Sequence, residues 1–490
     1  MEAAQESQSA AWRHITGGGA GKVGIVLTFA PPLAAGLILR VWMLRRLFEV
    51  NGDSLIYGSL AKNLLLHGRF DLTLPNGEMY PTLIRLPGYP LFLAGCFRLF
   101  GMENYFAAAC VQIGLELLGC LLLADFARRV APEPIRRISA LATLWLAALC
   151  PFTASYAVVP FTEGPTLFAL ALAMWALARF RERPGWANAL WFTFAVTWAA
   201  LLRPDGALAA VAFAPALLIG LAYGNGPGQV PLRKLTQIAA VCVVLALAPF
   251  ALWTARNWRV FHVLEPLAPR LAIDPDESSN QGWERWVKSW CLDFVSTYEI
   301  YWNVPWDKLD VSELPARAFD SPAQRAETAA LADDYNRTGM TITPEIDARF
   351  EKLAEERIAA NPLRYYLWLP LGRVADMWLR PRVENLNIDL DWWVYAHHRA
   401  ETRFSWFYVE LNALYLLLAW AGLTTRPRFW GFLLAYMLLR SALLLTVEAP
   451  EARYTLESFP MLFVLGGVAM GHALGRRHLP ANLKASEGSD

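Results

Sequence analysis

The sequence predicts an all-α polytopic membrane protein, a bundle of about ten or more transmembrane helices. Of its 490 residues, 56% are hydrophobic and only 18% are charged, whereas an ordinary soluble domain is about 25% charged. The charges are missing from long stretches, each close to the roughly 20 apolar residues that a bilayer core requires. The net charge of +1 offers no basic field for phosphate backbones, so nucleic acid is excluded as a partner.

Ten stretches are apolar enough to be predicted as membrane spans: roughly 23–44, 104–127, 138–157, 164–180, 186–202, 206–223, 236–255, 404–424, 429–447 and 458–475. The apolar stretch 86–100 is too short to cross and is predicted to lie at the membrane interface. Residues 363–380 fit either an eleventh span or an amphipathic juxtamembrane helix. No apolar core of a signal peptide occurs in the first 22 residues, so the first span is expected to direct insertion.

The orientation follows from lysine and arginine in the short loops. With the N-terminus inside, every short inner loop is basic. The outer turns at 153–163 and 203–205 contain a single basic residue, Arg203. Both termini are therefore expected in the cytoplasm. The predicted regions are 1–255, with a first outer loop at about 45–103; 256–403, a large outer region; and 404–490, the last helices and a short tail. The long polar outer segments suggest a site on the outer face.

Two acidic residues of the outer segments are candidates for catalysis. Asp53 follows Gly52 at the start of a predicted helix that ends at Gly68, with Tyr57 one turn further on. It is either the N-cap of that helix or a carboxylate placed beside a lipid head group. Glu163 is the only acid of the second outer turn; it is either a solvated helix cap or a second carboxylate of the same site.

Arginines on the outer side depart from the positive-inside trend. Some of them, such as those near the end of the first span, can simply extend to the lipid head groups. A cluster would instead bind phosphate, because the guanidinium group matches phosphate bidentately. The candidates are Arg85, Arg203, Arg256 and Arg453, of which Arg256 and Arg453 lie just beyond apolar spans. Within the spans, Glu116 is expected to make an interhelical bond.

The outer region is rich in tryptophan, for which two interpretations stand side by side. Interfacial belts enrich tryptophan in any membrane protein, and tryptophan faces can also stack on sugars in an acceptor cleft. The residues concerned are Trp283, Trp286, Trp290, Trp302, Trp306, Trp392 and Trp393. Five of the six cysteines lie in apolar segments, and no disulfide is predicted.

Seven sequence pieces occur in the order of a known family. They are the Asp53-x-x-x-Tyr57 motif, PGYPLFLAGCFRLFG at 87–101, Glu163, LLRPDG at 201–206, ARNWRVF at 255–261, NPLRYYLWLPLGR at 361–373 and EARYTLESFP at 451–460. The chain resembles GT-C superfamily glycosyltransferases, specifically bacterial relatives of the dolichyl-phosphate-mannose protein mannosyltransferases and the lipid A aminoarabinose transferases.

The resemblance implies a GT-C-type bundle with outer juxtamembrane helices in a bacterial cytoplasmic membrane. It further implies an inverting hexosyl- or pentosyltransferase that uses a polyprenyl-phosphate-linked sugar donor and an envelope glycan, lipid or protein acceptor. By position, Asp53 would be the base or acceptor-orienting carboxylate and Glu163 the second-loop acid. Arg256 and Arg453 would hold the lipid phosphate, and the remaining donor- or substrate-binding residues would be Tyr57, Arg85, Arg203 and Tyr454.

The family's first loop often reads Asp-Glu, whereas this chain has Ser54 after Asp53. No cofactor is implied with certainty, and a divalent metal stays open. A membrane glycan polymerase or ligase would share an arginine-rich outer site and is the nearest alternative function. A glycolipid flippase or transporter is less well supported, because the sequence lacks two related halves.

Overall fold

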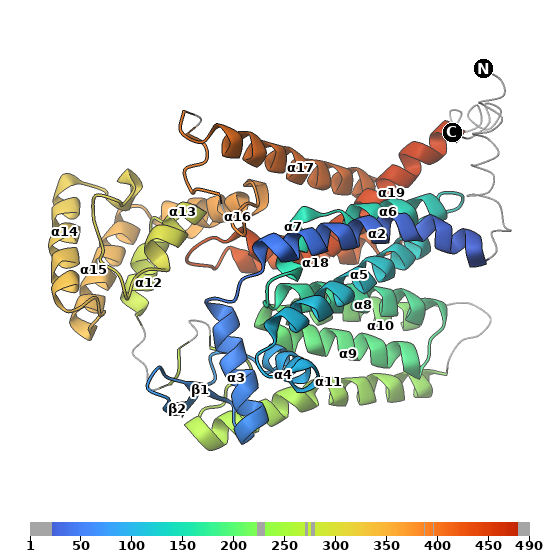
Figure 1. The fold of residues 1–490 in the computed structure, drawn as a ribbon, viewed down its shortest axis with the longest axis horizontal. Coiled ribbons are helices and arrows are strands. Elements are labelled where there is room, and N and C mark those ends of the chain that lie inside the picture. Colours follow the sequence, from blue (N-terminus) through green and yellow to red (C-terminus); the bar gives the residue numbers. More distant parts are fainter. Residues whose placement is uncertain are drawn as a thin grey trace. The chain divides into compact units, whose positions relative to one another are not determined.

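The computed structural model describes residues 22–222, 231–269, 273–275, 280–386, 388–394 and 396–478. These residues are mainly helical (Figure 1), and the strands among them form one antiparallel hairpin, β1 (Asp71–Thr73) with β2 (Met79–Pro81). The all-α class predicted from the sequence is therefore confirmed. Two compact units are present. One combines the described residues up to Pro269 with Ala413–Met437 and those from Glu457 onward; the other combines Arg270–Asn412 with Leu438–Leu456.

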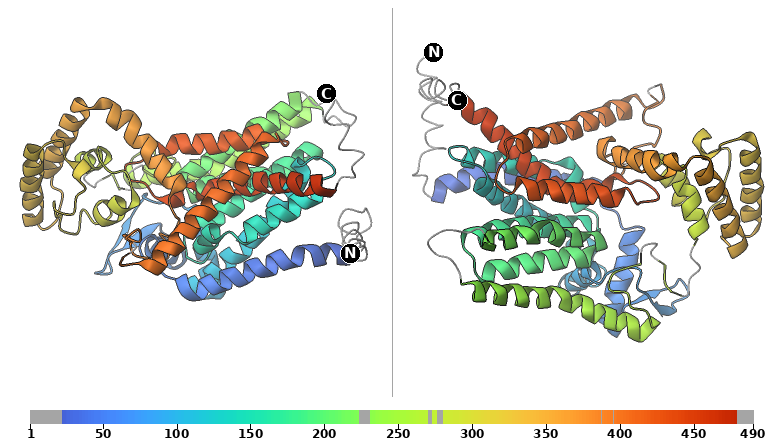
Figure 2. Two further views of the ribbon diagram at one scale, coloured as in Figure 1. Left: turned by 90° about the horizontal axis from the view of Figure 1, so that it is seen from above. Right: turned by 180° about the vertical axis from the view of Figure 1, so that it is seen from behind.

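The first unit is a helical bundle. Figures 1 and 2 show α5, α6 and α8 running side by side, and the contacts agree: α5 packs against α6 and α8, α8 against α9, and α19 against α6. Its helices are α2 (Lys22–Leu47), α3 (Asp53–His67), α4 (Gly88–Phe100), α5 (Tyr105–Val130), α6 (Arg136–Ala148), α7 (Pro151–Ala157), α8 (Glu163–Glu182), α9 (Trp186–Leu202), η1 (Pro204–Ala207), α10 (Leu208–Ala222), α11 (Leu232–Phe261) and α19 (Phe459–His478).

Every predicted span coincides with helix in the described residues. By length and hydropathy, four described segments can cross a membrane: α5, α11, α17 (Arg399–Thr424), and Ala452–Gly475, which contains most of α19. The pair α6 and α7, bent by 55°, adds a fifth if it counts as one span. The remaining predicted crossings stay predictions. Residues 363–380 form η4 (Arg364–Trp368) and α16 (Leu369–Leu379), which are not among the segments that qualify.

A buried ion pair holds α2 inside the bundle. Arg40 is fully buried, and its Nε lies 2.6 Å from Oε2 of Glu116 on α5. The same guanidinium donates to the carbonyl of Ala148 at the end of α6. Glu116 thus makes the expected interhelical bond, whereas Arg40 does not extend to the head groups, because its charge is compensated inside the bundle.

Small residues bring the last helix close to α6. A Cβ atom at Gly467 on α19 would lie 2.0 Å from Oγ1 of Thr143 on α6. Only glycine permits this backbone approach, as is common between membrane helices. The contact explains how the C-terminal helix becomes part of a bundle built mainly from the N-terminal half of the chain.

The second unit has its own apolar core. It contains α12 (Gln281–Lys288), α13 (Phe294–Ser296), η2 (Thr297–Tyr301), η3 (Ala316–Ala318), α14 (Pro322–Arg337), α15 (Pro344–Ala360), η4 and α16. Helices α17, α18 (Trp430–Leu444) and η5 (Ala452–Ser458) contain residues of both units.

Three of the outer tryptophans form this core instead of a belt or a sugar platform. Trp283, Trp286 and Trp290 are at most 1% exposed, and the rings of Trp283 and Trp286 pack against Phe350 of α15. Both interpretations offered from the sequence are therefore wrong for these residues. Trp283 and Trp286, three residues apart, lie on one face of α12 that is buried against α15, and Trp290 follows just after the helix ends.

Candidate active site

Asp53 is the first residue of α3, and its carboxylate is engaged by an arginine of the same unit. The N-cap position belongs to Gly52, which lacks a side chain, so the N-cap interpretation of Asp53 is wrong. Oδ1 of Asp53 accepts a hydrogen bond of 2.6 Å from Nη2 of Arg85. The two side chains are 28% and 21% exposed, so solvent or a ligand can reach this ion pair. Helix α3 ends at His67, which confirms the predicted end at Gly68, and Gly68 is its C-cap in a left-handed conformation.

Glu163 is the first residue of α8 and is buried rather than solvated. Its side chain is 1% exposed, and Oε1 accepts from Nη1 of Arg203 at 2.9 Å. The interpretation of Glu163 as a solvated helix cap is therefore wrong. A buried carboxylate requires such a partner, because an uncompensated charge in this position would be strongly destabilising.

Arg203 serves more than one acid. Its Nε lies 3.2 Å from Oδ1 of Asp205 and 3.2 Å from Oε1 of Glu457, whose side chain is 1% exposed. Three carboxylates thus surround one guanidinium group. Sequence reasoning missed Glu457, although the motif at 451–460 contains it. One signal was available: Glu457 directly precedes the predicted span at 458–475, and a carboxylate buried at such a position requires a nearby cation.

Hydrogen bonds tie the Asp53 helix to the turn that carries Glu163. Oγ of Ser54 donates to the carbonyl of Pro160 at 3.3 Å. The hydroxyl of Tyr89 on α4 donates to Gln112 at 2.6 Å, and the amide of Gln112 donates to the carbonyl of Val159 at 2.8 Å. The first outer loop and the second outer turn are therefore fixed against each other.

Tyr57 lies where these two segments meet. Burial raises the pKa of its phenol to about 12, with smaller contributions from Asp53 and Glu163, which raise it, and from Arg85 and Arg203, which lower it. The guanidinium of Arg85 also lies 5.8 Å from the Tyr57 ring centre. Five of the predicted site residues thus gather in one place, and the phenol keeps its proton at neutral pH.

Arg256 holds the first outer loop. At the end of α11, it donates to the carbonyl oxygens of Thr82 (2.8 Å) and Phe70 (2.9 Å), on either side of the β1–β2 hairpin. Its guanidinium also lies about 5 Å from the ring centres of Trp253 and Phe261. These contacts position the loop that follows Asp53. Binding of a lipid phosphate by Arg256 stays a prediction.

Arg453 and Tyr454 belong to the second unit. Both engage Glu451: its Oε2 lies 2.5 Å from Nε of Arg453, and its Oε1 accepts from the Tyr454 hydroxyl. The Tyr454 carbonyl in turn accepts from Nε of Arg440 at 2.6 Å. Both residues are thus held by a local network, and their predicted contact with donor phosphate stays a prediction.

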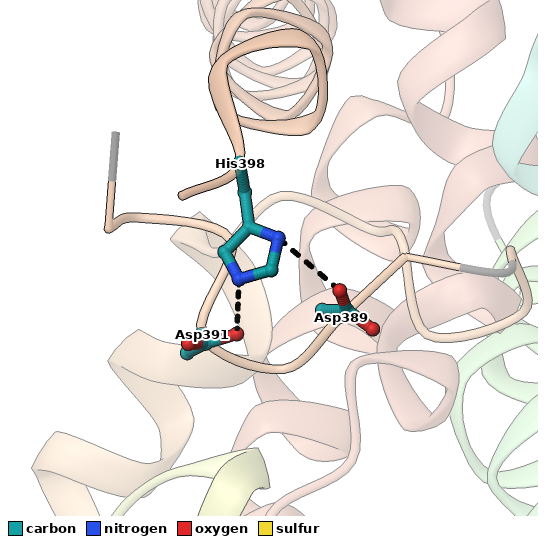
Figure 3. A group of neighbouring side chains, drawn as sticks. All are labelled: Asp389, Asp391 and His398. Atoms are coloured by element: carbon teal, nitrogen blue, oxygen red, sulfur yellow. Dashed lines mark ion pairs between the residues drawn. The ribbon is translucent and has the colours of Figure 1, made fainter. Parts of the chain in front are cut away.

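One group of the described residues has the composition of a metal site. Asp389, Asp391 and His398 of the second unit could each offer a ligand atom, all within 4.8 Å of one another. Figure 3 shows the two carboxylates on different nitrogens of the ring: Nδ1 lies 3.2 Å from Asp389 and Nε2 lies 3.1 Å from Asp391. Because each carboxylate contacts a different nitrogen of the same ring, this geometry fits a polar cluster around His398 better than shared coordination of a metal.

Comparison with known proteins finds a family match in the central part of the chain. Residues 84–257 match the family described as dolichyl-phosphate-mannose-protein mannosyltransferase. No curated protein matches the sequence.

Two solved structures illustrate the likeness. Archaeal oligosaccharyltransferase AglB from Archaeoglobus fulgidus, in complex with an inhibitory peptide and a dolichol-phosphate, is 12% identical, with a TM-score of 0.46 over 95% of this chain. The chain covers 52% of that protein, about half its length. ArnT from Cupriavidus metallidurans bound to undecaprenyl phosphate is 15% identical, with a TM-score of 0.37, over 93% of this chain and 79% of ArnT.

Of the predicted site residues, the family match includes Arg85, Glu163, Arg203 and Arg256, whereas Asp53 and Tyr57 precede it and Arg453 and Tyr454 follow it. The predicted resemblance to the dolichyl-phosphate-mannose protein mannosyltransferases is confirmed for residues 84–257.

Proposed function

We propose that this protein is an integral membrane glycosyltransferase that moves a sugar from a polyprenyl-phosphate donor to an envelope acceptor. The observation that carries the proposal is the Asp53–Arg85 ion pair beside Tyr57, next to a segment that matches a glycosyltransferase family. In this proposal the reaction occurs at the outer face of a bacterial cytoplasmic membrane, both termini are cytoplasmic, and the anomeric carbon is inverted.

Asp53 would act as the general base. The acceptor oxygen forms a bond to the anomeric carbon while the bond from that carbon to the phosphate oxygen breaks, and the acceptor proton passes to the carboxylate. Polyprenyl phosphate leaves with the electron pair. A single displacement of this kind inverts the carbon and requires alignment of the acceptor more than strong chemical activation. The partly exposed carboxylate of Asp53 can reach an acceptor hydroxyl.

Arg85 would bind the donor phosphate. Its guanidinium now pairs with Asp53 at 2.6 Å and is 21% exposed. The donor phosphate is a diester with a single negative charge, and its two non-bridging oxygens can accept two parallel hydrogen bonds from the guanidinium group. Its arrival would draw Arg85 away from the carboxylate and leave Asp53 able to accept a proton. The donor would thereby prepare its own general base.

Arg203 has a different role in this proposal. Three carboxylates already surround its guanidinium, so an added phosphate would meet net negative charge. Arg203 therefore holds Glu163 and Glu457 in place, and Arg85 is the better candidate for the donor. This assignment revises the sequence-based expectation that Arg203 contacts substrate.

The test compares cells that carry the wild type, a deletion, Asp53→Asn or Asp125→Asn. Asp125 is a matched control, since its carboxylate is 29% exposed and also pairs with an arginine, whereas that of Asp53 is 28% exposed. Mass spectrometry of envelope glycolipids and polysaccharides should show the loss of one sugar mass and accumulation of polyprenyl-phosphate sugar in the deletion and in Asp53→Asn only.

The accumulated mass would also distinguish a hexose from a pentose. Accumulation of a complete oligosaccharide on its lipid would instead favour a polymerase, ligase or flippase. Full activity of Asp53→Asn would remove Asp53 from the mechanism.

A further inference from the structure

The second unit contains a cavity whose lining residues have no part in the proposed chemical step. Its volume is about 460 Å³, within the usual range for small-ligand sites. It is lined by residues from α13 and η2, from the loop before η3, from the end of α16, and from the loop that carries Trp392 and Trp393. All of these segments belong to one compact unit, so the cavity is defined within that unit.

The positive charges that line the cavity are already neutralised. Nη2 of Arg317 pairs with Asp293 and lies 2.9 Å from Oγ of Ser296. Arg380 is 10% exposed and has an ion-pair contact of 2.6 Å with Glu384 and one of 3.3 Å with Asp376. Neither guanidinium group is therefore available to an incoming anion without breaking existing pairs.

Two further acids of the cavity have no such compensation. Glu299 and Glu313 both line the cavity and are exposed. In the described part of the chain, no basic side chain lies within ion-pair distance of either carboxylate. Glu299, Glu313 and Asp293 line the same cavity, and burial, then Glu313, Asp293 and Asp391, raise the pKa of Glu299. The cavity thus has an excess of negative charge.

The wall formed by the two tryptophans adds an aromatic surface. Trp392 and Trp393 meet edge to face, with ring centres 5.9 Å apart, and Trp393 is 52% exposed. Indole faces pack against the C–H faces of sugar rings and also attract cations. Exposed indole beside uncompensated carboxylates suits a ligand that has both a ring and a positive charge.

We infer that this cavity binds an amine-bearing saccharide, with the ammonium group held by Glu299 and Glu313 and a sugar ring against Trp393. If the proposed function is correct, this saccharide is part of the acceptor, and the second unit selects acceptors by their positive charge. A neutral sugar would keep the ring contact and lose the charged contact.

The test uses two disaccharide probes of the same skeleton, the glucosamine dimer and its N-acetylated form. Binding to the purified full-length protein in nanodiscs is measured by calorimetry at neutral pH and physiological salt, without donor. The amine form should bind at least about tenfold more tightly, because each charged hydrogen bond contributes on the order of a tenfold change in affinity. Equal affinity for the two probes, or no binding of the amine, would overturn the inference.

Variants separate the two contacts. The double variant Glu299→Gln/Glu313→Gln should remove the preference for the amine, while Trp393→Ala should weaken both probes. Asp333→Asn on α14 is the control, since this exposed acid is not among the residues that line the cavity. An unchanged preference in the double glutamine variant would contradict the assignment.

The same assay keeps this inference apart from the proposed function. Asp53→Asn protein should bind the amine probe as the wild type does, because Asp53 belongs to the other unit. Binding without any transfer in the cellular assay would refute the transferase and leave the saccharide site intact. Transfer in cells without a preference for the amine probe would refute the saccharide site and leave the transferase proposal intact.

Discussion

Replacing Arg203 by methionine tests whether this residue holds the buried acids. Glu163 and Glu457 are each 1% exposed, and Arg203 contacts both. Methionine is unbranched and apolar and carries no charge, so two buried carboxylates would lose the cation that contacts them both. Breaking a buried ion pair from one side costs about 3–5 kcal/mol, since the remaining charge stays desolvated. We therefore expect Arg203→Met to destabilise the first unit by at least this amount.

The assay is thermal unfolding in one nanodisc preparation, followed by loss of helical signal. At roughly 2 °C per kcal/mol for a large chain, the midpoint should fall by about 6–10 °C. Arg128→Met provides the comparison: Arg128 is 45% exposed and pairs with Asp125, so its loss should cost no more than about 1 kcal/mol.

A second substitution identifies the cause of the loss. The double variant Arg203→Met/Glu163→Gln removes one of the two buried carboxylate charges. It should therefore be more stable than Arg203→Met alone. Glu163→Gln alone should cost less than Arg203→Met, because Arg203 would keep Glu457 and Asp205. The reasoning fails if Arg203→Met is no more destabilising than Arg128→Met, or if the second substitution lowers stability further.

Three further outcomes are expected. Asp53→Asn should fold normally and lower the transfer rate about 10²–10⁴-fold, as measured in detergent extracts with a polyprenyl-phosphate sugar. Burial raises the pKa of Asp376 from 3.8 to about 6. Its folded pKa thus exceeds its unfolded value, and stability is lost as the pH rises from about 4 to about 6. Asp376→Asn should therefore match the wild type in thermal unfolding at pH 4 and exceed it at pH 7, by at most about 3 kcal/mol. Trp286→Ala should cost about 3–5 kcal/mol, seen as earlier unfolding of the second unit, whereas the exposed Trp306→Ala should cost little.

The helical framework could be predicted because it depends on local pattern. Runs of apolar residues mark the spans, Gly68 marks the end of α3, and the short apolar segment at 86–100 coincides with α4. Each signal needs only neighbours in the sequence. The same locality explains the incorrect assignment of the tryptophans near 283–290: composition suggested an interface, whereas the three-residue spacing of Trp283 and Trp286 indicated a buried helix face.

The pairings of the site could not be predicted, because they join distant positions. The sequence indicated Asp53 and Arg85 separately as base and phosphate ligand, and the structure shows them 2.6 Å apart. Arg256 was expected beside phosphate, yet its guanidinium contacts the carbonyl oxygens of Thr82 and Phe70. A single sequence identifies which charges need partners but not which partners the packing provides.

Within the proposed function, the balance of charge in the first unit favours Arg85 over Arg203 as a phosphate ligand. Around Arg203, three carboxylates share one guanidinium group, and two of them are almost fully buried. An anion approaching this group would be repelled, and would also have to compete with acids that cannot move into water. At Asp53 the carboxylate pairs with Arg85, and both side chains are partly exposed, so a phosphate can approach this guanidinium group from solvent. The proposed function therefore assigns the donor phosphate to Arg85, where the released carboxylate of Asp53 would also meet the acceptor.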